Sequence, residues 1–129
     1  MSGPVLISIV DDDESLRSAL VGLVRSLGYE ARGFESAEHF LQADGMRDAS
    51  CIITDIQMPG MSGIDLQRHL TATGCTVPTI MITARPEKEL EASAQASGAM
   101  CLLRKPFEAD VLVECVEKAL ELGSKSATD

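Results

Sequence analysis

The apolar residues of this chain fall into short runs that alternate with helical stripes. Residues 5–10, VLISIV, form an apolar, β-branched run that stops at three aspartates, which is typical of a strand buried on both faces. Three similar runs follow at residues 51–54, 77–83 and 100–103. Residues 29–35 are a weaker candidate, because Gly33 interrupts them. We interpret all five segments as β-strands.

Between these runs, apolar residues recur at helical spacing. The clearest stripe is closed by Gly28 as a C-cap, and its members are Leu16, Ala19, Leu20, Leu23, Val24 and Leu27. Ser36 and Ser62 are placed to N-cap two further helices. Pro86 suits the first turn of a fourth helix, over residues 87–97, whose thin apolar face predicts the least firm docking.

The last predicted helix carries one apolar stripe, made of Leu112, Cys115, Val116, Ala119 and Leu120. The small, polar residues 123–129 that follow resemble the start of a linker or a frayed end. Strand and helix thus alternate five times with short connections, which predicts a single α/β domain with a parallel sheet and helices on both faces. In such a fold, ligands bind beyond the carboxyl ends of the strands.

Polar side chains stand at those strand ends. Asp11–Asp13 follow the first run, Asp55 the third, Thr83 closes the fourth, and Lys105 follows the fifth. Each residue alone has an ordinary role as a cap or a solvated charge. Together, the carboxylates would raise one another's pKa unless a cation were bound, which indicates a site for Mg²⁺. Asp55 is then the candidate nucleophile toward a phosphoryl group, with Lys105 neutralising charge and Thr83 donating its hydroxyl.

Composition narrows the classes of function. A net charge of −9 and a pI near 4.6 argue against a nucleic-acid surface, which needs Lys and Arg. The first apolar run is too short for a signal peptide or a membrane span. The four cysteines lack metal-site spacing and suit a reducing cytoplasm. His39 and His69 lie on predicted helices away from the strand ends, so we expect surface roles for both.

The segments VDDDESLR, TDIQMPGMSGIDL, ITA and LLRKPF, in this order, resemble the receiver domain of two-component response regulators. The likeness covers residues 5–122, and DIQMPGMSGIDL is most similar to the FixJ-type subfamily. The resemblance implies a flavodoxin-like (βα)5 fold, which is a doubly wound five-stranded parallel sheet of order 2-1-3-4-5. It also implies a receiver domain at residues 1–122, with residues 123–129 as a tail or the start of a linker.

The resemblance implies a role for each acidic residue. Asp55 would accept a phosphoryl group from a phosphohistidine of a sensor histidine kinase. Asp12 and Asp55 would ligate Mg²⁺ directly, or Mn²⁺ in its place, together with the backbone carbonyl of Gln57, and Asp11 would act through a water. The domain would be a signalling phosphoacceptor rather than an enzyme, with slow self-phosphorylation from small phosphodonors and slow self-dephosphorylation.

The remaining strand-end residues also match the family. Thr83 corresponds to the switch hydroxyl and Lys105 to the phosphate-contacting lysine, and we expect the Lys105–Pro106 peptide bond to be cis. Asp13 falls outside the acid pair, and its short side chain suits the N-cap of the first helix.

One position departs from the family pattern. Receiver domains usually carry a Tyr or Phe three residues before the lysine, but Leu102 stands there. We therefore expect a different path of transmission, or one carried mainly by the loop at residues 83–88. Gln57 and Arg85 stand where family members tune the lifetime of the phosphate.

Two alternative functions remain open. One is a Mg²⁺-dependent phosphohydrolase acting through Asp55, although Gln57 stands where such an enzyme would place its general acid. The other is a degenerate receiver that binds partners without phosphorylation. Beyond the kinase, the expected partners are a DNA-binding output domain outside these residues or a downstream protein, and a homodimer linked to phosphorylation. We expect no direct contact with nucleic acid or membrane.

Overall fold

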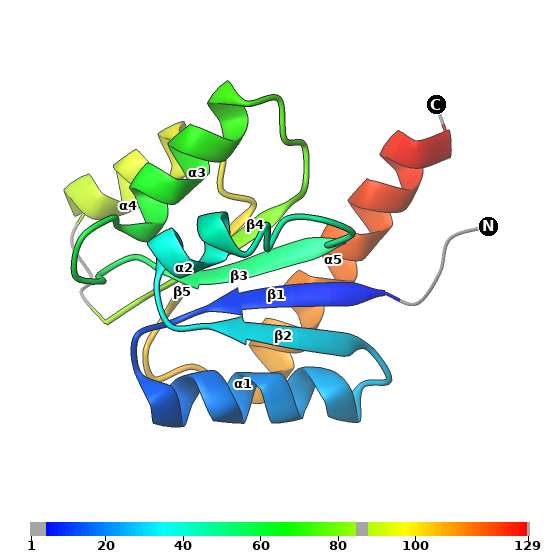
Figure 1. The fold of residues 1–129 in the computed structure, drawn as a ribbon. Helices are drawn as coiled ribbons and strands as arrows, with labels where there is room; N and C mark the ends of the chain where they lie inside the picture. The colour runs from blue at the N-terminus through cyan, green and yellow to red at the C-terminus, as the bar shows by residue number, and fades with distance from the viewer. Residues whose placement is uncertain (1–4, 85–87, 129) are drawn as a thin grey trace.

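Strands and helices alternate along the chain as the apolar pattern predicts. The computed structural model describes residues 5–84 and 88–128, with residues 122–128 described by their backbone. The elements in chain order are β1 (Leu6–Val10), α1 (Glu14–Ser26), β2 (Glu30–Phe34), α2 (Ala37–Gln42), β3 (Cys51–Asp55), α3 (Gly63–Ala72), β4 (Thr79–Thr83), α4 (Lys88–Ala96), β5 (Cys101–Arg104) and α5 (Ala109–Thr128). The strands form one parallel sheet of order β2-β1-β3-β4-β5 (Figure 1). The predicted flavodoxin-like fold and its strand order are confirmed.

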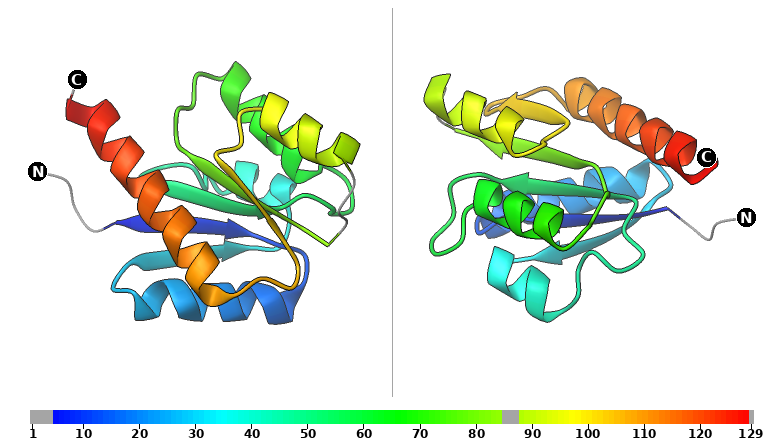
Figure 2. Two further views of the ribbon diagram at one scale, coloured as in Figure 1. Left: turned by 180° about the vertical axis from the view of Figure 1, so that it is seen from behind. Right: turned by 90° about the horizontal axis from the view of Figure 1, so that it is seen from above.

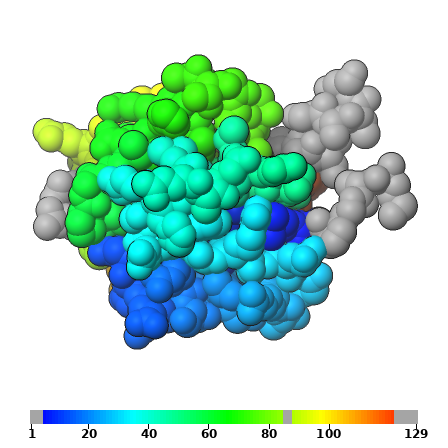
Figure 3. All heavy atoms as spheres, viewed as in Figure 1, coloured from blue at the N-terminus to red at the C-terminus, as the bar shows by residue number. Residues whose placement is uncertain are grey.

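Helices cover both faces of the sheet. α1 and α5 lie on one face, and α2, α3 and α4 lie on the other (Figure 2). Successive strand residues face opposite layers, so in β3 Ile53 packs beneath α1 and α5 while Ile52 packs beneath α2 and α3. In the space-filling view, α2, the loop after it and α3 lie in front of much of the sheet (Figure 3). This two-sided burial explains why the central strands β1, β3 and β4 are mostly apolar, whereas the edge strand β2 has exposed polar residues at Glu30 and Arg32.

The predicted helix caps are present. Asp13 accepts two backbone N–H groups from the first turn of α1, and Ser36 accepts one from α2. Ser62 and Asp65 form a capping box at the start of α3, each side chain accepting the other's backbone N–H. Gly28 follows the end of α1 with a φ of 93°, a left-handed conformation that favours glycine.

β4 begins two residues later than the apolar run that predicted it. Pro78 has no N–H for the ladder, although its carbonyl accepts the N–H of Ile52 at 3.0 Å. The regular strand therefore starts at Thr79.

Two features of the C-terminal half refine the sequence-based picture. α5 continues to Thr128, beyond the end of its apolar stripe, and the division of the chain at residue 122 stays a prediction. Arg85 and Pro86 lie outside the described residues.

Of the residues described in α4, only Ala94 is buried, which agrees with the weak docking predicted for this helix. Among the described residues, no helix is both long and apolar enough to cross a membrane.

Gly63 sets how closely α3 approaches the end of β3. A Cβ added at Gly63 would overlap the backbone carbonyl oxygen of Asp55 and lie 3.1 Å from its carbonyl carbon. The N–H of Gly63 donates to the carbonyl of Ile56 at 3.0 Å. The absence of a side chain therefore brings the first residue of α3 against the backbone of Asp55.

We predict that Gly63→Ala lowers the free energy of unfolding by about 1 to 3 kcal/mol, because backbone cannot yield as a flexible side chain would. Gly22→Ala is the matched control: Gly22 lies within α1, nothing stands within 4 Å of its added Cβ, and alanine there should stabilise by about 0.5 to 1 kcal/mol. Urea unfolding of both variants checks the pair, and equal stabilisation by both would contradict the close approach at Gly63.

Candidate functional site

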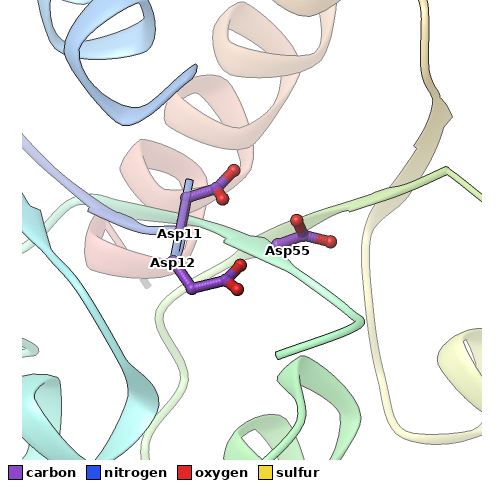
Figure 4. A group of neighbouring side chains, drawn as sticks. All are labelled: Asp11, Asp12 and Asp55. Carbon is purple, nitrogen blue, oxygen red and sulfur yellow. The ribbon is translucent and has the colours of Figure 1, made fainter. Parts of the chain in front are cut away.

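Three carboxylates converge at the carboxyl end of the sheet, and we call Asp11, Asp12 and Asp55 the acidic centre. Asp11 and Asp12 directly follow β1, and Asp55 is the last residue of the neighbouring strand β3. Each residue offers one carboxylate oxygen to a group whose members all lie within 4.8 Å of one another. In Figure 4, the side chains of Asp11 and Asp12 extend toward the side on which Asp55 lies. The sequence prediction that these residues meet is confirmed.

Asp11 is fully buried, and this has an electrostatic cost. Its Oδ1 accepts the N–H of Asp13 at 2.9 Å, but its buried Oδ2 has no hydrogen-bond partner within the described part of the chain. Burial raises the pKa of Asp11 from 3.8 to about 6; the Asp13 N–H opposes this shift, and the charge of Asp55 adds to it.

Asp55 is held between a cation and a backbone donor. Lys105, directly after β5, donates from its Nζ to Asp55 Oδ2 at 2.9 Å. The N–H of Gln57 donates to Asp55 Oδ1 at 3.3 Å. Burial alone would lower the pKa of Lys105, but the hydrogen bond and charge of Asp55, with the charge of Asp11, raise it. Lys105 therefore remains a cation beside the acidic centre.

Thr83 ends β4, the strand next to β3, and its side chain is fully buried. Its hydroxyl donates to Oε1 of Gln57 at 3.0 Å. Gln57 thus contacts Asp55 through its backbone and Thr83 through its side chain. The sequence placed Thr83 at this edge but gave no sign of a contact with the Gln57 amide. The Lys105–Pro106 peptide bond is cis, as the sequence prediction had it.

The acidic centre fits a hard divalent cation. Three carboxylates lie close together with one ammonium nearby, and Asp11 Oδ2 is a buried acceptor without a partner among the described residues. Carboxylate oxygens in a partly exposed cluster are the ligands that Mg²⁺ takes while retaining waters. Asp12 is exposed, which leaves the cluster open to solvent on its side.

The other predicted residues lie away from this centre. Leu102 pairs with Met81 in the sheet and packs in an aliphatic cluster that includes Ile56 and Leu90. His39 and His69 are exposed on α2 and α3. The cysteines are unpaired, with Cys51 and Cys115 buried and Cys75 and Cys101 half-buried.

Two supporting residues were missed at the sequence level. Arg17 donates from its Nη1 to the backbone carbonyl of Asp11 at 2.8 Å. Glu38 on α2 accepts the N–H of Met61 at 2.8 Å and so ties α2 to the loop after β3. This bond spans 23 residues, and no local pattern indicates it.

The sequence as a whole matches one family model. The model is described as "Response regulator receiver domain", and it matches residues 7–117. The chain belongs to this family. The geometry above is thus that of a receiver domain.

Named relatives place this receiver domain more closely. It is 38% identical over 118 residues to "Response regulator protein TmoT" of Ectopseudomonas mendocina, covering 92% of this chain and 54% of the relative. It is 35% identical over 116 residues to "Transcriptional regulatory protein FixJ" of Rhizobium meliloti (strain 1021), covering 89% and 56%. The chain therefore spans about half the length of these relatives. The FixJ-type likeness predicted from sequence is supported.

Solved structures agree with the fold. The response regulator StyR matches with a TM-score of 0.89 at 36% identity, covering 98% of this chain and 64% of that one. The structure named FixJ-N matches with a TM-score of 0.83 at 33% identity, covering 92% and 95%. The fold of this chain therefore accounts for nearly the whole FixJ-N chain.

We predict that Asp11→Asn stabilises the metal-free receiver domain at about pH 8 by about 1 to 3 kcal/mol, because it removes a buried charge. The folded-state pKa of about 6 lies above the reference value of 3.8. The contribution of Asp11 to stability is therefore complete below about pH 4 and is lost as the pH rises through 6. The gain from Asp11→Asn should accordingly shrink toward pH 4.

Urea unfolding in the presence of a chelator, repeated across this pH range, measures the difference. Asp12→Asn is the control, since Asp12 is exposed, and it should change stability less. A difference between Asp11→Asn and wild type that stays constant with pH would contradict the prediction.

Proposed function

We propose that this receiver domain is a Mg²⁺-dependent phosphoacceptor switch in which Asp55 takes a phosphoryl group from a phosphohistidine of a sensor histidine kinase. The observation that carries the proposal is the position of Asp55. One of its oxygens accepts from the Lys105 ammonium at 2.9 Å, and its carboxylate also belongs to the acidic centre. A carboxylate beside both a cation and a candidate metal site is suited to receive a group that carries several negative charges.

The transfer needs no proton from Asp55. An oxygen of the ionised carboxylate attacks phosphorus, and an acyl phosphate O–P bond forms as the P–N bond to histidine breaks. The histidine nitrogen keeps the electron pair of that bond, and a neutral imidazole leaves when its other ring nitrogen carries a proton. The Lys105 ammonium lies close enough to Asp55 to stabilise the negative charge of its carboxylate and then that of a phosphoryl oxygen.

The metal would be held by Asp12, Asp55 and the backbone carbonyl of Gln57, with Asp11 acting through a water. Bound there, Mg²⁺ or Mn²⁺ would neutralise charge on the phosphoryl oxygens. Asp11 is fully buried and anchored by the N–H of Asp13 and the side chain of Arg17. These contacts fix the orientation that the carboxylate presents to the centre.

The two alternatives receive less support. A phosphohydrolase would need a general acid beside the leaving group, and the residue two positions after Asp55 is an amide, Gln57, whose side chain contacts Thr83. A degenerate receiver would not need the Lys105–Asp55 ion pair that this domain retains. Slow loss of phosphate to water remains part of the proposal.

The output of the switch is proposed by likeness. FixJ is named a transcriptional regulatory protein, so we propose that the phosphorylated domain passes its signal to a transcriptional output, through a linked domain, a downstream protein or a homodimer. We also propose a cytoplasmic location, where the cysteines, free in this structure, would stay reduced.

Incubation with Mg²⁺ and phosphoramidate should add one phosphoryl group to the receiver domain, and intact mass spectrometry measures the gain. The adduct should be labile to base, as acyl phosphates are, and absent from Asp55→Asn. A folded wild type that binds Mg²⁺ and gains no phosphate would overturn the proposed function, and turnover of a small phosphoester would instead favour the hydrolase.

Lys105→Met should slow this phosphorylation about 100-fold, because a fixed cation that stabilises transition-state charge typically contributes about that factor. Arg104→Met is the matched control, since Arg104 is the adjacent cation but pairs with Glu91 on α4. The rate of mass gain compares the two variants, and similar rates would refute the role assigned to Lys105.

A further inference from the structure

Gln57 contacts both Asp55 and Thr83, the two residues that the proposed switch has to connect. Its backbone N–H donates to Asp55 Oδ1 at 3.3 Å, and its side-chain Oε1 accepts the Thr83 hydroxyl at 3.0 Å. Asp55 and Thr83 end neighbouring strands, so the Gln57–Thr83 hydrogen bond joins the loop after β3 to the end of β4. Gln57 and Thr83 are 26 residues apart in sequence.

The hydrogen bond has a direct competitor in the phosphorylated state. The sequence predicts Thr83 as the switch hydroxyl, which would donate to a phosphoryl oxygen on Asp55. A hydroxyl has a single proton to donate, so donation to the phosphoryl group requires that the bond to Gln57 be given up. The side-chain oxygen of Gln57, Oε1, and the phosphoryl oxygen are therefore alternative acceptors for the same proton.

Gln57 is held in this arrangement at a cost. Its Nε2 is buried and has no hydrogen-bond partner within the described part of the chain, and an unpaired buried donor disfavours the conformation that contains it. Gln57 also lines an open surface groove together with Ile56, Met58, Pro59, Ser62, Ile64 and Leu90. The side chain thus has space to move into, where its amide would meet water.

We propose that the Gln57 side chain holds Thr83 in the unphosphorylated arrangement and sets how readily phosphorylation of Asp55 draws Thr83 to the phosphate. Gln57 acts in this as a positioning residue through Thr83. The inference rests on the proposed function, and it concerns the side chain of Gln57 rather than its backbone carbonyl.

The size of the effect follows from the kind of bond. The net contribution of a neutral hydrogen bond corresponds to a change of about threefold to tenfold in an equilibrium. Removing the Gln57 acceptor should therefore favour the arrangement that contacts phosphate by a similar factor. It should also speed phosphorylation by up to about that factor, to the extent that Thr83 has already moved when the O–P bond forms.

The first test needs no phosphate. Three-bond NMR couplings of Thr83 report its side-chain rotamer in the metal-free, unphosphorylated domain. We expect one dominant rotamer in wild type and a lower population of that rotamer in Gln57→Leu, which keeps much of the bulk but has no acceptor. Met58→Leu is the control, because it alters the same groove without removing a hydrogen bond to Thr83. An unchanged rotamer population in Gln57→Leu would overturn the inference.

The second test is a double-mutant cycle on the rate of phosphorylation by phosphoramidate, followed by intact mass. Gln57→Leu should raise the rate when Thr83 is present, and it should have no such effect in a Thr83→Val background. An equal effect in both backgrounds would show that Gln57 acts on Asp55 directly, which also overturns the inference.

The two tests separate this inference from the proposed function. If wild type gains no phosphate, the proposed function fails, and the rotamer measurement alone decides whether Gln57 holds Thr83. If wild type is phosphorylated on Asp55 but the cycle shows no coupling, only the inference about Gln57 fails.

Discussion

The Lys105–Asp55 ion pair is the interaction on which the edge of this sheet depends. Parallel strands end together, so the fold itself brings Asp11, Asp12 and Asp55 to one place. The Nζ of Lys105 supplies a positive charge 2.9 Å from Asp55. That charge is not enough for Asp11, whose pKa rises to about 6 mainly through burial. The remaining excess of negative charge supports the proposal that this centre binds a cation.

The segment that carries Asp55 is fixed on several sides. Glu38 bonds to the loop after β3 from α2, the capping box of Ser62 fixes the start of α3, and Gly63 lies against the Asp55 backbone. The neighbouring α4 is held differently, with Ala94 as its buried residue among those described. A change at Asp55 therefore meets a rigid loop on the α3 side and a lightly packed helix on the α4 side. Thr83 precedes α4, so its position is where such a change would be transmitted.

How far the sequence could predict this structure differs between backbone and side chains. The sheet was predicted from runs that are apolar on both faces, and the caps at Asp13 and Ser62 were predicted from short polar residues that precede helices. The acidic centre was predicted from the residues at the strand ends, because the carboxyl ends of parallel strands lie at the same edge of the sheet. The Gln57–Thr83 bond was beyond reach because it depends on the rotamer of a long side chain. The length of α5 was also beyond reach, since its backbone continues after the apolar stripe has ended. At Leu102, the sequence showed the departure from the family but not the aliphatic cluster that surrounds it.

The burial of Asp11 can also be considered in terms of folding. Most of the sheet is built from groups that favour the folded state, yet its functional edge contains a carboxylate that is destabilised by being there. A site of this kind conflicts locally with the fold that carries it, as functional sites often do. By thermodynamic linkage, any ligand that relieves this conflict only in the folded state stabilises the whole domain. The buried carboxylate of Asp11 thus also makes the stability of the domain depend on whether a ligand is bound at the acidic centre.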